Sequence, residues 1–219
     1  METEELSNSD IEAQAFAFYA AGYDTSASTL CFMLYHLALE PEIQERLRNE
    51  IDVYLRTHGD QIDLETLNEL PYLDQVLNET LRMYPSDDTL LRKAQNDYKC
   101  PGTNVEVSRG QIVLIPVLGI HYDEKYYPNP EIFNPENFAR ENLIGRHPCS
   151  FLPFGLGPRN CIGIRFARAQ VRACVIKLLS KFRVEACKDT VRSFCFDPYR
   201  LNIAPDKKLY VNFHPRMDR

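Results

Sequence analysis

The sequence predicts a mainly α-helical protein with a minor β-sheet. Apolar residues recur at helical spacing through most of residues 10–84 and again over residues 163–182. Strand-like runs are confined to residues 90–116 and 194–213, where the first stretch is punctuated by turn-forming pairs. The length suits one domain or part of a larger one, so we treat residues 1–219 as a single unit.

The composition is typical of a folded protein and argues against several classes. With 44% hydrophobic and 26% charged residues, the chain does not resemble a disordered protein. The formal net charge of −6 provides no overall basic field, so we expect no nucleic-acid partner. Its seven cysteines include no C-x-x-C pair, which disfavours a disulfide framework and a structural zinc site. No apolar run reaches the ~18 residues of a membrane span, and the polar, acidic start resembles no signal peptide.

The first element is predicted to be a long helix that starts near Asp10. Ser9 and Glu12 have the spacing of a capping box, and Pro41 sets the end of the helix. The apolar stretch at residues 13–22 indicates that this helix crosses the middle of a large core.

Three shorter helices follow the first one. Gly59 ends the second helix of the chain, and Pro85 ends the fourth. These three helices are expected over residues 42–58, 63–70 and 72–84.

The second half of the chain changes character. We expect short strands within residues 90–116, around turns at Pro101-Gly102 and Arg109-Gly110. Residues 121–160 are rich in Pro and Asn and show little periodicity, which in a compact protein is typical of a functional segment. A helix is expected over residues 163–182, and two short strands within residues 194–213.

The run from Phe154 to Gly163 carries the residues with the clearest chemistry. Cys161 lies just before a predicted helix, whose positive end favours a thiolate. Gly155 and Gly157 permit unusual backbone angles, and Arg159 lies two residues from the cysteine, where it could meet a carboxylate. From these residues alone, a buried cysteine in a glycine-rich turn remains an equally good interpretation.

This run resembles the haem-binding signature of the cytochrome P-450 family. The signature is Phe, two residues, Gly, one residue, Arg, one residue, Cys, one residue and Gly, which matches Phe154, Gly157, Arg159, Cys161 and Gly163. The resemblance implies haem b (iron protoporphyrin IX) as cofactor, with Cys161 as the axial thiolate on the metal. It also implies that Arg159 pairs with a haem propionate, that Phe154 packs beside the thiolate, and that the two glycines flank it.

A second motif lies inside the long helix. Gly22 in mid-helix costs ~1 kcal/mol relative to alanine, and Thr25 can hydrogen-bond back to the Ala21 carbonyl and open the helix locally. A close helix crossing with a hydrogen-bonded Asp24 would explain the same residues. The run resembles the oxygen-binding groove of the same family, which implies that Asp24 and Thr25 are catalytic and deliver protons to dioxygen.

Two further stretches resemble the family, and one of them departs from it. A helical wheel places Glu79 and Arg82 opposite the apolar stripe, so on residues alone they read as a surface ion pair. The resemblance instead implies a structural role near the haem. Asn137 stands where the family has an arginine that completes a polar network with the Glu79–Arg82 pair. Because asparagine carries no charge, we expect this network to be weaker here. The residues 86–89 are Ser-Asp-Asp-Thr, so either the pocket is acidic there or the carboxylates face solvent.

A basic helix face follows the cysteine. Arg165, Arg168 and Arg172 share one face, with Lys177 and Lys181 nearby. This face is either simply solvated or a docking surface for the NADPH-dependent flavoprotein reductase that the resemblance implies.

The resemblance implies a haem-thiolate monooxygenase that inserts one oxygen atom of dioxygen into lipophilic small molecules, such as xenobiotics, steroids or fatty acids. The sequence looks like the animal microsomal branch and, within it, resembles the arthropod xenobiotic-metabolising group. The full-length parent would then lie on the cytoplasmic face of the endoplasmic reticulum membrane, held by an N-terminal anchor absent from this chain.

The chain corresponds to less than half of a family member, so we expect an incomplete, C-terminal portion of the cytochrome P-450 fold. Much of the apolar surface of the long helix would then lack a partner, so the isolated chain is expected to be inactive or poorly folded. Two alternatives remain open: a haem-thiolate isomerase or dehydratase, which would not need Asp24 and Thr25, and a non-catalytic haem-binding or interaction fragment.

Overall fold

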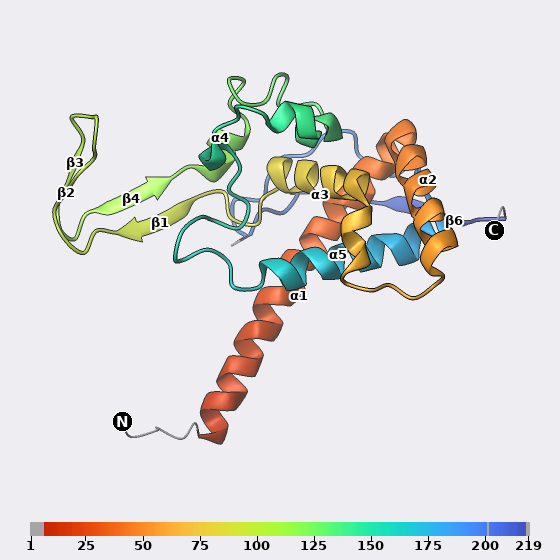
Figure 1. Cartoon of the computed structure of the whole chain (residues 1–219), viewed down its shortest axis with the longest axis horizontal. Coiled ribbons are helices and arrows are strands. Elements are labelled where there is room, and N and C mark those ends of the chain that lie inside the picture. The colour runs from red at the N-terminus through yellow and green to blue at the C-terminus, as the bar shows by residue number, and fades with distance from the viewer. Residues whose placement is uncertain (1–6, 201, 218–219) are drawn as a thin grey trace.

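The computed structural model describes residues 7–200 and 202–217. Its body is built from four helices that pack together (Figure 1). These helices are α1 (Asn8–Leu39), α2 (Pro41–His58), α3 (Pro71–Met83) and α5 (Ile164–Leu179). The predicted mainly α-helical class with a minor sheet is therefore confirmed. None of the helices in the described part of the chain combines the length and apolarity that a membrane crossing requires.

The long helix α1 has the predicted extent but a different N-terminal cap. The Ser7 side chain accepts a hydrogen bond from the Asp10 backbone N–H at 3.2 Å, and the Asp10 carboxylate accepts one from the Ser7 N–H at 3.0 Å. The capping box therefore starts at Ser7 and not at Ser9. The Asp10 side chain is one methylene group shorter than that of a Glu but still reaches back, so the earlier serine can serve as the cap.

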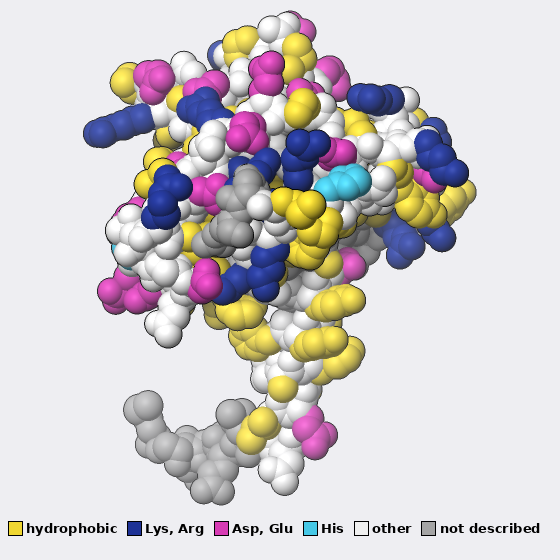
Figure 2. All heavy atoms as spheres, turned by 90° about the vertical axis from the view of Figure 1, so that its right-hand side faces the viewer, with side chains coloured by type: hydrophobic (Ala, Val, Ile, Leu, Met, Phe, Trp, Pro, Cys, Tyr) yellow, Lys and Arg dark blue, Asp and Glu magenta, His cyan; other side chains and the backbone are white. Residues whose placement is uncertain are grey.

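The two halves of α1 have opposite surroundings. Its C-terminal half is buried among the other helices, and Phe32 and Leu37 are 1% and 0% exposed. Its N-terminal half projects from the body, where Phe16 and Tyr19 are 71% and 66% exposed (Figures 1 and 2). The expectation that much apolar surface of this helix lacks a partner within the chain is confirmed.

The core lies between the C-terminal half of α1 and the inner faces of α2, α3 and α5. Proline occupies the first turn of both α2 and α3, where a missing N–H costs nothing. A 3-10 helix, η1 (Thr66–Glu69), replaces the short helix expected between them. Fully buried apolar side chains fill the centre of this core, among them Leu47, Ile51, Leu73, Val76, Val175 and Ile176.

Strands in the described residues form three separate two-stranded antiparallel sheets. β1 (Leu90–Lys93) pairs with β4 (Ile112–Ile115), and β2 (Tyr98–Lys99) pairs with β3 (Glu106–Val107). The predicted turns are present, because Gly102 and Gly110 have φ angles of 73° and 84°, which favour glycine.

The third sheet corrects the prediction for the tail. β5 (Phe182–Ala186) pairs with β6 (Val211–Pro215), whereas the described residues between 194 and 210 contribute only an isolated bridge between Phe196 and Pro205. The helix expected up to residue 182 ends at Leu179, and the chain turns directly into β5. Pairing between segments about 30 residues apart leaves no local sequence signal, which explains the error.

The irregular segment, residues 122–160, follows the short helix α4 (Val117–His121). It contains three 3-10 helices, η2 (Pro135–Phe138), η3 (Arg140–Leu143) and η4 (Pro148–Ser150). The η2 helix lies against α3. The irregular segment therefore covers one face of α3 before it leads into the loop that carries Cys161.

Candidate cofactor-binding site

The cysteine loop, residues 154–163, is a closed turn that leads into α5. The Cys161 backbone N–H donates to the Phe154 carbonyl at 2.9 Å, which joins the two ends of the loop. Gly155 and Gly157 adopt left-handed φ angles of 71° and 84°, and a residue with a side chain would be strained at either position. These glycines let the chain reverse within a few residues and bring the cysteine back to the start of the loop.

The thiol of Cys161 lies near the N-terminus of α5. That helix begins at Ile164, and Gly163 is its N-cap residue. A Cβ built at Gly163 would lie 3.9 Å from the Cys161 sulfur, so glycine keeps this side of the sulfur open.

The surface around this cysteine is both exposed and apolar. Cys161 itself is exposed, as is Arg159 two residues before it. In the same loop and the first turns of α5, Leu156, Ile162 and Phe166 are 57%, 86% and 67% exposed. One exposed thiol, an apolar surface and a nearby guanidinium are the features expected for a flat apolar cofactor with one sulfur ligand and carboxylate groups. The residues present therefore fit haem.

The motif around Gly22, Asp24 and Thr25 in α1 has the backbone hydrogen bond predicted for it, with one difference. The Thr25 hydroxyl donates to the Ala21 carbonyl at 2.8 Å, as expected. The helix nevertheless stays continuous from Asn8 to Leu39, so this hydrogen bond does not open it. Gly22 lies where α1 approaches α5, because a Cβ built there would come within 3.9 Å of the Phe166 ring.

Asp24 is exposed and has a partner in the C-terminal tail. Its carboxylate accepts a hydrogen bond from Asn202 Nδ2 at 2.6 Å. The Asp24 carboxylate is therefore held by Asn202 while it stays open to solvent. No pattern in the sequence indicates Asn202 as its partner.

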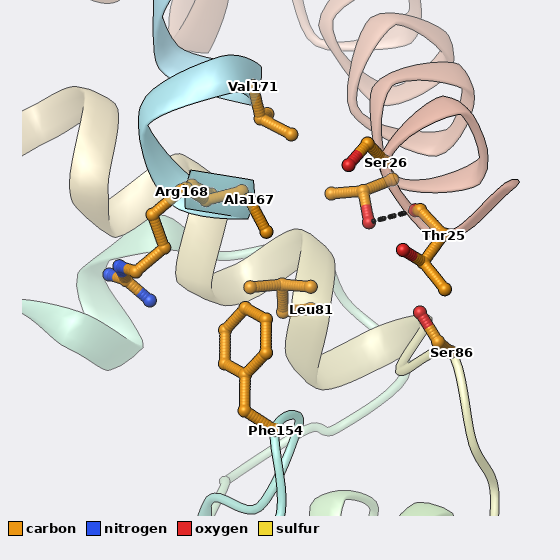
Figure 3. Close-up of a pocket in the computed structure, with 10 residues that line it drawn as sticks. Thr25, Ser26, Leu81, Ser86, Phe154, Ala167, Arg168 and Val171 are labelled. Carbon is orange, nitrogen blue, oxygen red and sulfur yellow. Dashed lines mark hydrogen bonds between the residues drawn. The ribbon is translucent and has the colours of Figure 1, made fainter. Parts of the chain in front are cut away.

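A small cavity of about 30 Å³ lies between the Thr25 region of α1 and the cysteine loop. Side chains from α1, α3, α5 and the cysteine loop line it, and Figure 3 shows Thr25 and Phe154 on its walls together with Leu81 and Ser86. Ser26 also lines the cavity, and its buried hydroxyl has no hydrogen-bond partner in the described chain. A space of this size and polarity suits one water molecule.

Among the predicted site residues, the structure brings Thr25 and Phe154 to the same cavity. Cys161 lies in the same loop as Phe154, but its sulfur is on the exposed surface and does not line the cavity. Arg159 is also exposed, and Gly157 and Gly163 shape the backbone on either side of the cysteine.

Glu79 and Arg82 form a buried ion pair on α3. Arg82 Nε and Nη2 donate to Glu79 Oε2 and Oε1, each at 2.8 Å, and both side chains are 0% exposed. The expectation of a surface pair was therefore wrong. The irregular segment covers the polar face of α3, which a helical wheel of α3 alone cannot show.

Groups of α4 and of the irregular segment complete this ion pair. Arg82 Nη1 donates to the His121 carbonyl at 3.0 Å. Glu79 Oε1 accepts the Asn134 backbone N–H at 2.8 Å and Asn137 Nδ2 at 3.1 Å. Asn137 thus keeps a hydrogen bond to the pair, although it adds no charge.

The stretch after α3 presents its two carboxylates to solvent. Asp87 and Asp88 are exposed, whereas Ser86 lines the cavity near Thr25. The sequence left open whether these carboxylates make the pocket acidic or face solvent, and in the described chain they face solvent.

The basic face of α5 is partly internal. Arg172 Nη2 lies 2.7 Å from Asp74 Oδ1 on α3, and Arg172 is 8% exposed. Arg168 Nη2 donates to Asn78 Oδ1 at 2.8 Å. These two arginines therefore hold α5 against α3, while Arg165 remains on the surface.

His121 is a functional candidate that no sequence pattern indicates. It is a single histidine in a stretch without periodicity, yet its side chain is 0% exposed. Its ring contacts the backbone of α3 on one side and the backbone just before the cysteine loop on the other. Only the tertiary structure reveals this connection.

Comparison with known proteins identifies relatives along almost the whole chain. A family model described as "Cytochrome P450" matches residues 1–213. The chain is 52% identical over 214 residues to "Cytochrome P450 6B4" of Papilio glaucus, which covers 98% of this chain and 43% of that protein. It is 50% identical over 218 residues to "Cytochrome P450 6B2" of Helicoverpa armigera, covering 100% and 43%. It is 41% identical over 211 residues to "Cytochrome P450 6l1" of Blattella germanica, covering 96% and 42%. The chain thus spans less than half the length of these curated relatives.

Proposed function

Because the chain belongs to the cytochrome P450 family, we propose that it forms the haem-thiolate part of a monooxygenase, with Cys161 as the axial ligand of haem b. One observation carries the proposal: a single exposed thiol lies at the N-terminus of α5, among exposed apolar side chains. In this assignment Arg159 meets a propionate, Phe154 packs beside the thiolate, and Gly157 and Gly163 let the cofactor approach. When bound, haem activates dioxygen, and a thiolate ligand favours O–O cleavage.

In this proposal Asp24 and Thr25 handle the protons. Thr25 Oγ1 holds its proton against the Ala21 carbonyl, and rotation of the hydroxyl would present that proton to the cofactor side of α1. The Asp24 carboxylate, exposed and held by Asn202, would resupply the proton from solvent. Overall, one dioxygen, two electrons and two protons convert a substrate C–H group to C–OH and release one water.

The partners and the substrates follow from the same family membership. We assign an NADPH-dependent flavoprotein reductase as the electron donor and lipophilic small molecules, such as xenobiotics, steroids or fatty acids, as substrates. The endoplasmic reticulum membrane, on its cytoplasmic face, is the proposed location of the parent protein. Of the cations expected to dock the reductase, Arg165, Lys177 and Lys181 remain on the surface.

The 219-residue chain by itself is proposed to be inactive or poorly folded. The support is the exposed apolar half of α1, where Phe16, Phe18, Tyr19 and Tyr23 are each more than half exposed. Surfaces of this kind favour association with another partner or aggregation.

The test is the carbon monoxide difference spectrum of the reduced protein after addition of haem, recorded on the longest natural form and on this chain. In the longest natural form we expect the strongly red-shifted Soret band of thiolate ligation, and we expect Cys161→Ala to abolish it. Cys149→Ala is the matched control, because Cys149 is an exposed cysteine of the irregular segment. A red-shifted band that survives Cys161→Ala would refute the assignment of the ligand.

A further inference from the structure

The His121 ring has a defined protonation pattern. Its Nε2 lies 2.8 Å from the Leu152 backbone nitrogen, and its Nδ1 lies 2.9 Å from the Arg82 carbonyl oxygen. A backbone N–H can only donate, so Nε2 must be an unprotonated acceptor. The single ring proton is therefore on Nδ1, where it donates to Arg82.

The contacts of His121 connect α3 with the segment before the cysteine loop. Arg82, the cation of the buried ion pair, returns a hydrogen bond to the His121 carbonyl at 3.0 Å. On the other side, the Phe151 ring stacks on His121 with centroids 5.4 Å apart. His121 is thus held at both its backbone and its ring.

Two backbone hydrogen bonds connect the segment at Leu152 to Cys161. The Leu152 carbonyl accepts the Gly155 N–H at 3.0 Å, and the Phe154 carbonyl accepts the Cys161 N–H at 2.9 Å. Leu152 is 6% exposed, so its N–H has no ready access to water if His121 does not accept it. The position of Leu152 therefore sets where the loop begins.

The ring must stay neutral to accept this hydrogen bond. Burial lowers the pKa of His121 to about 4, so the acceptor form predominates at neutral pH.

We propose that His121 is a positioning residue for the cysteine loop: by accepting the Leu152 N–H, it fixes the loop relative to α3 and holds the Cys161 sulfur in place. The anchoring of the loop stands on the contacts above, and its consequence for haem ligation rests on the proposed function.

Two substitutions separate the two hydrogen bonds of the ring. The amide of His121→Gln reaches the position of Nε2 and keeps an acceptor for Leu152. The amide of His121→Asn reaches the position of Nδ1 and keeps only the link to Arg82. His147→Asn is the control, because His147 also accepts a backbone N–H, from Cys149 at 3.1 Å, but is exposed.

The first readout is hydrogen–deuterium exchange of the peptide spanning residues 152–161, without haem, in the longest natural form of the protein. We expect exchange to be at least about tenfold faster in His121→Asn than in His121→Gln. The Asn variant leaves the buried Leu152 N–H without an acceptor, which destabilises the closed loop, whereas the Gln variant keeps that hydrogen bond. The control variant should match the unmodified protein. Equal exchange in the Gln and Asn variants would overturn the proposal, because a packing role alone predicts it.

The second readout is the fraction of thiolate-type carbon monoxide complex in the haem-loaded variants, which should fall in His121→Asn and be restored in His121→Gln. If the unmodified protein binds no haem, the proposed function fails. The exchange data still show whether His121 anchors the cysteine loop to α3. Should both variants fail to fold, ¹⁵N NMR of histidine in the unmodified protein decides it. A buried histidine protonated on Nδ1 is expected, and protonation on Nε2 would overturn the proposal.

Discussion

Glu79 and Arg82 form a bidentate ion pair with no exposed surface, whereas Lys99 and Glu106 form a pair in which both side chains are 69% exposed. The two pairs contain the same kinds of charge and differ in their surroundings. In water an ion pair contributes little to stability, because solvent and salt screen it. In the interior, loss of one partner leaves a charge that water cannot reach.

This difference predicts unequal effects of one type of substitution. Glu79→Gln should lower the free energy of unfolding by about 3–5 kcal/mol, because the Arg82 guanidinium would stay buried without its counter-charge. Glu106→Gln should change it by less than about 1 kcal/mol. Urea unfolding of both variants measures the two values, and similar small losses would contradict the buried pair.

The contact between α3 and α5 shows how whole elements are placed. Asp74 on α3 faces two arginines of α5, and it lies 2.7 Å from Arg172 and 3.7 Å from Arg168. Burial raises the pKa of Asp74, and the charges of Arg172 and Arg168 oppose this rise. The arginine face of α5 therefore contributes to the packing of the site's helix rather than to an open surface.

We predict that Asp74→Asn destabilises the protein by about 1–3 kcal/mol, because Arg172 is mostly buried and would lose its charged partner. Asp88→Asn, at an exposed position soon after α3, should leave stability unchanged. Thermal unfolding of the two variants is the measurement. An unaltered melting temperature in Asp74→Asn would mean that this pair does not hold α5 in place.

For the whole molecule, two buried histidines make stability depend on pH. Burial, and after it the positive charge of Arg82, lowers the pKa of His36 to about 3. Burial lowers the pKa of His121 to about 4. Both values lie below the ordinary 6.5, so the unfolded chain binds these protons first.

Stability should therefore be full above about pH 6.5 and fall as the pH drops toward these folded-state values. Between pH 6.5 and 5 the expected loss is up to about 1.4 kcal/mol per pH unit for each histidine. Denaturation curves across this range measure it. The slope should decrease in His36→Gln and stay the same in His147→Gln, since His147 is exposed. A flat profile for the unmodified protein would show that neither ring is buried in neutral form.

The sequence by itself determined the local features. Pro41, Gly59 and Pro85 marked the helix ends, because these residues restrict or free the backbone wherever they occur. The spacing from Phe154 to Gly163 identified the family through a pattern that needs no tertiary contact, and the comparisons confirmed that family. The back-bond from Thr25 to Ala21 was also predictable, since both ends lie one turn apart on one helix.

The tertiary structure alone decided which polar side chains are buried and which strands pair. The irregular segment has no periodicity, so its path over α3 could not be read from the sequence. That path turned Glu79 and Arg82 from an expected surface pair into the centre of a buried network, and it gave His121 its connection to the cysteine loop. Burial depends on neighbours that are distant in sequence, whereas caps, turns and spacing depend on residues only a few positions apart.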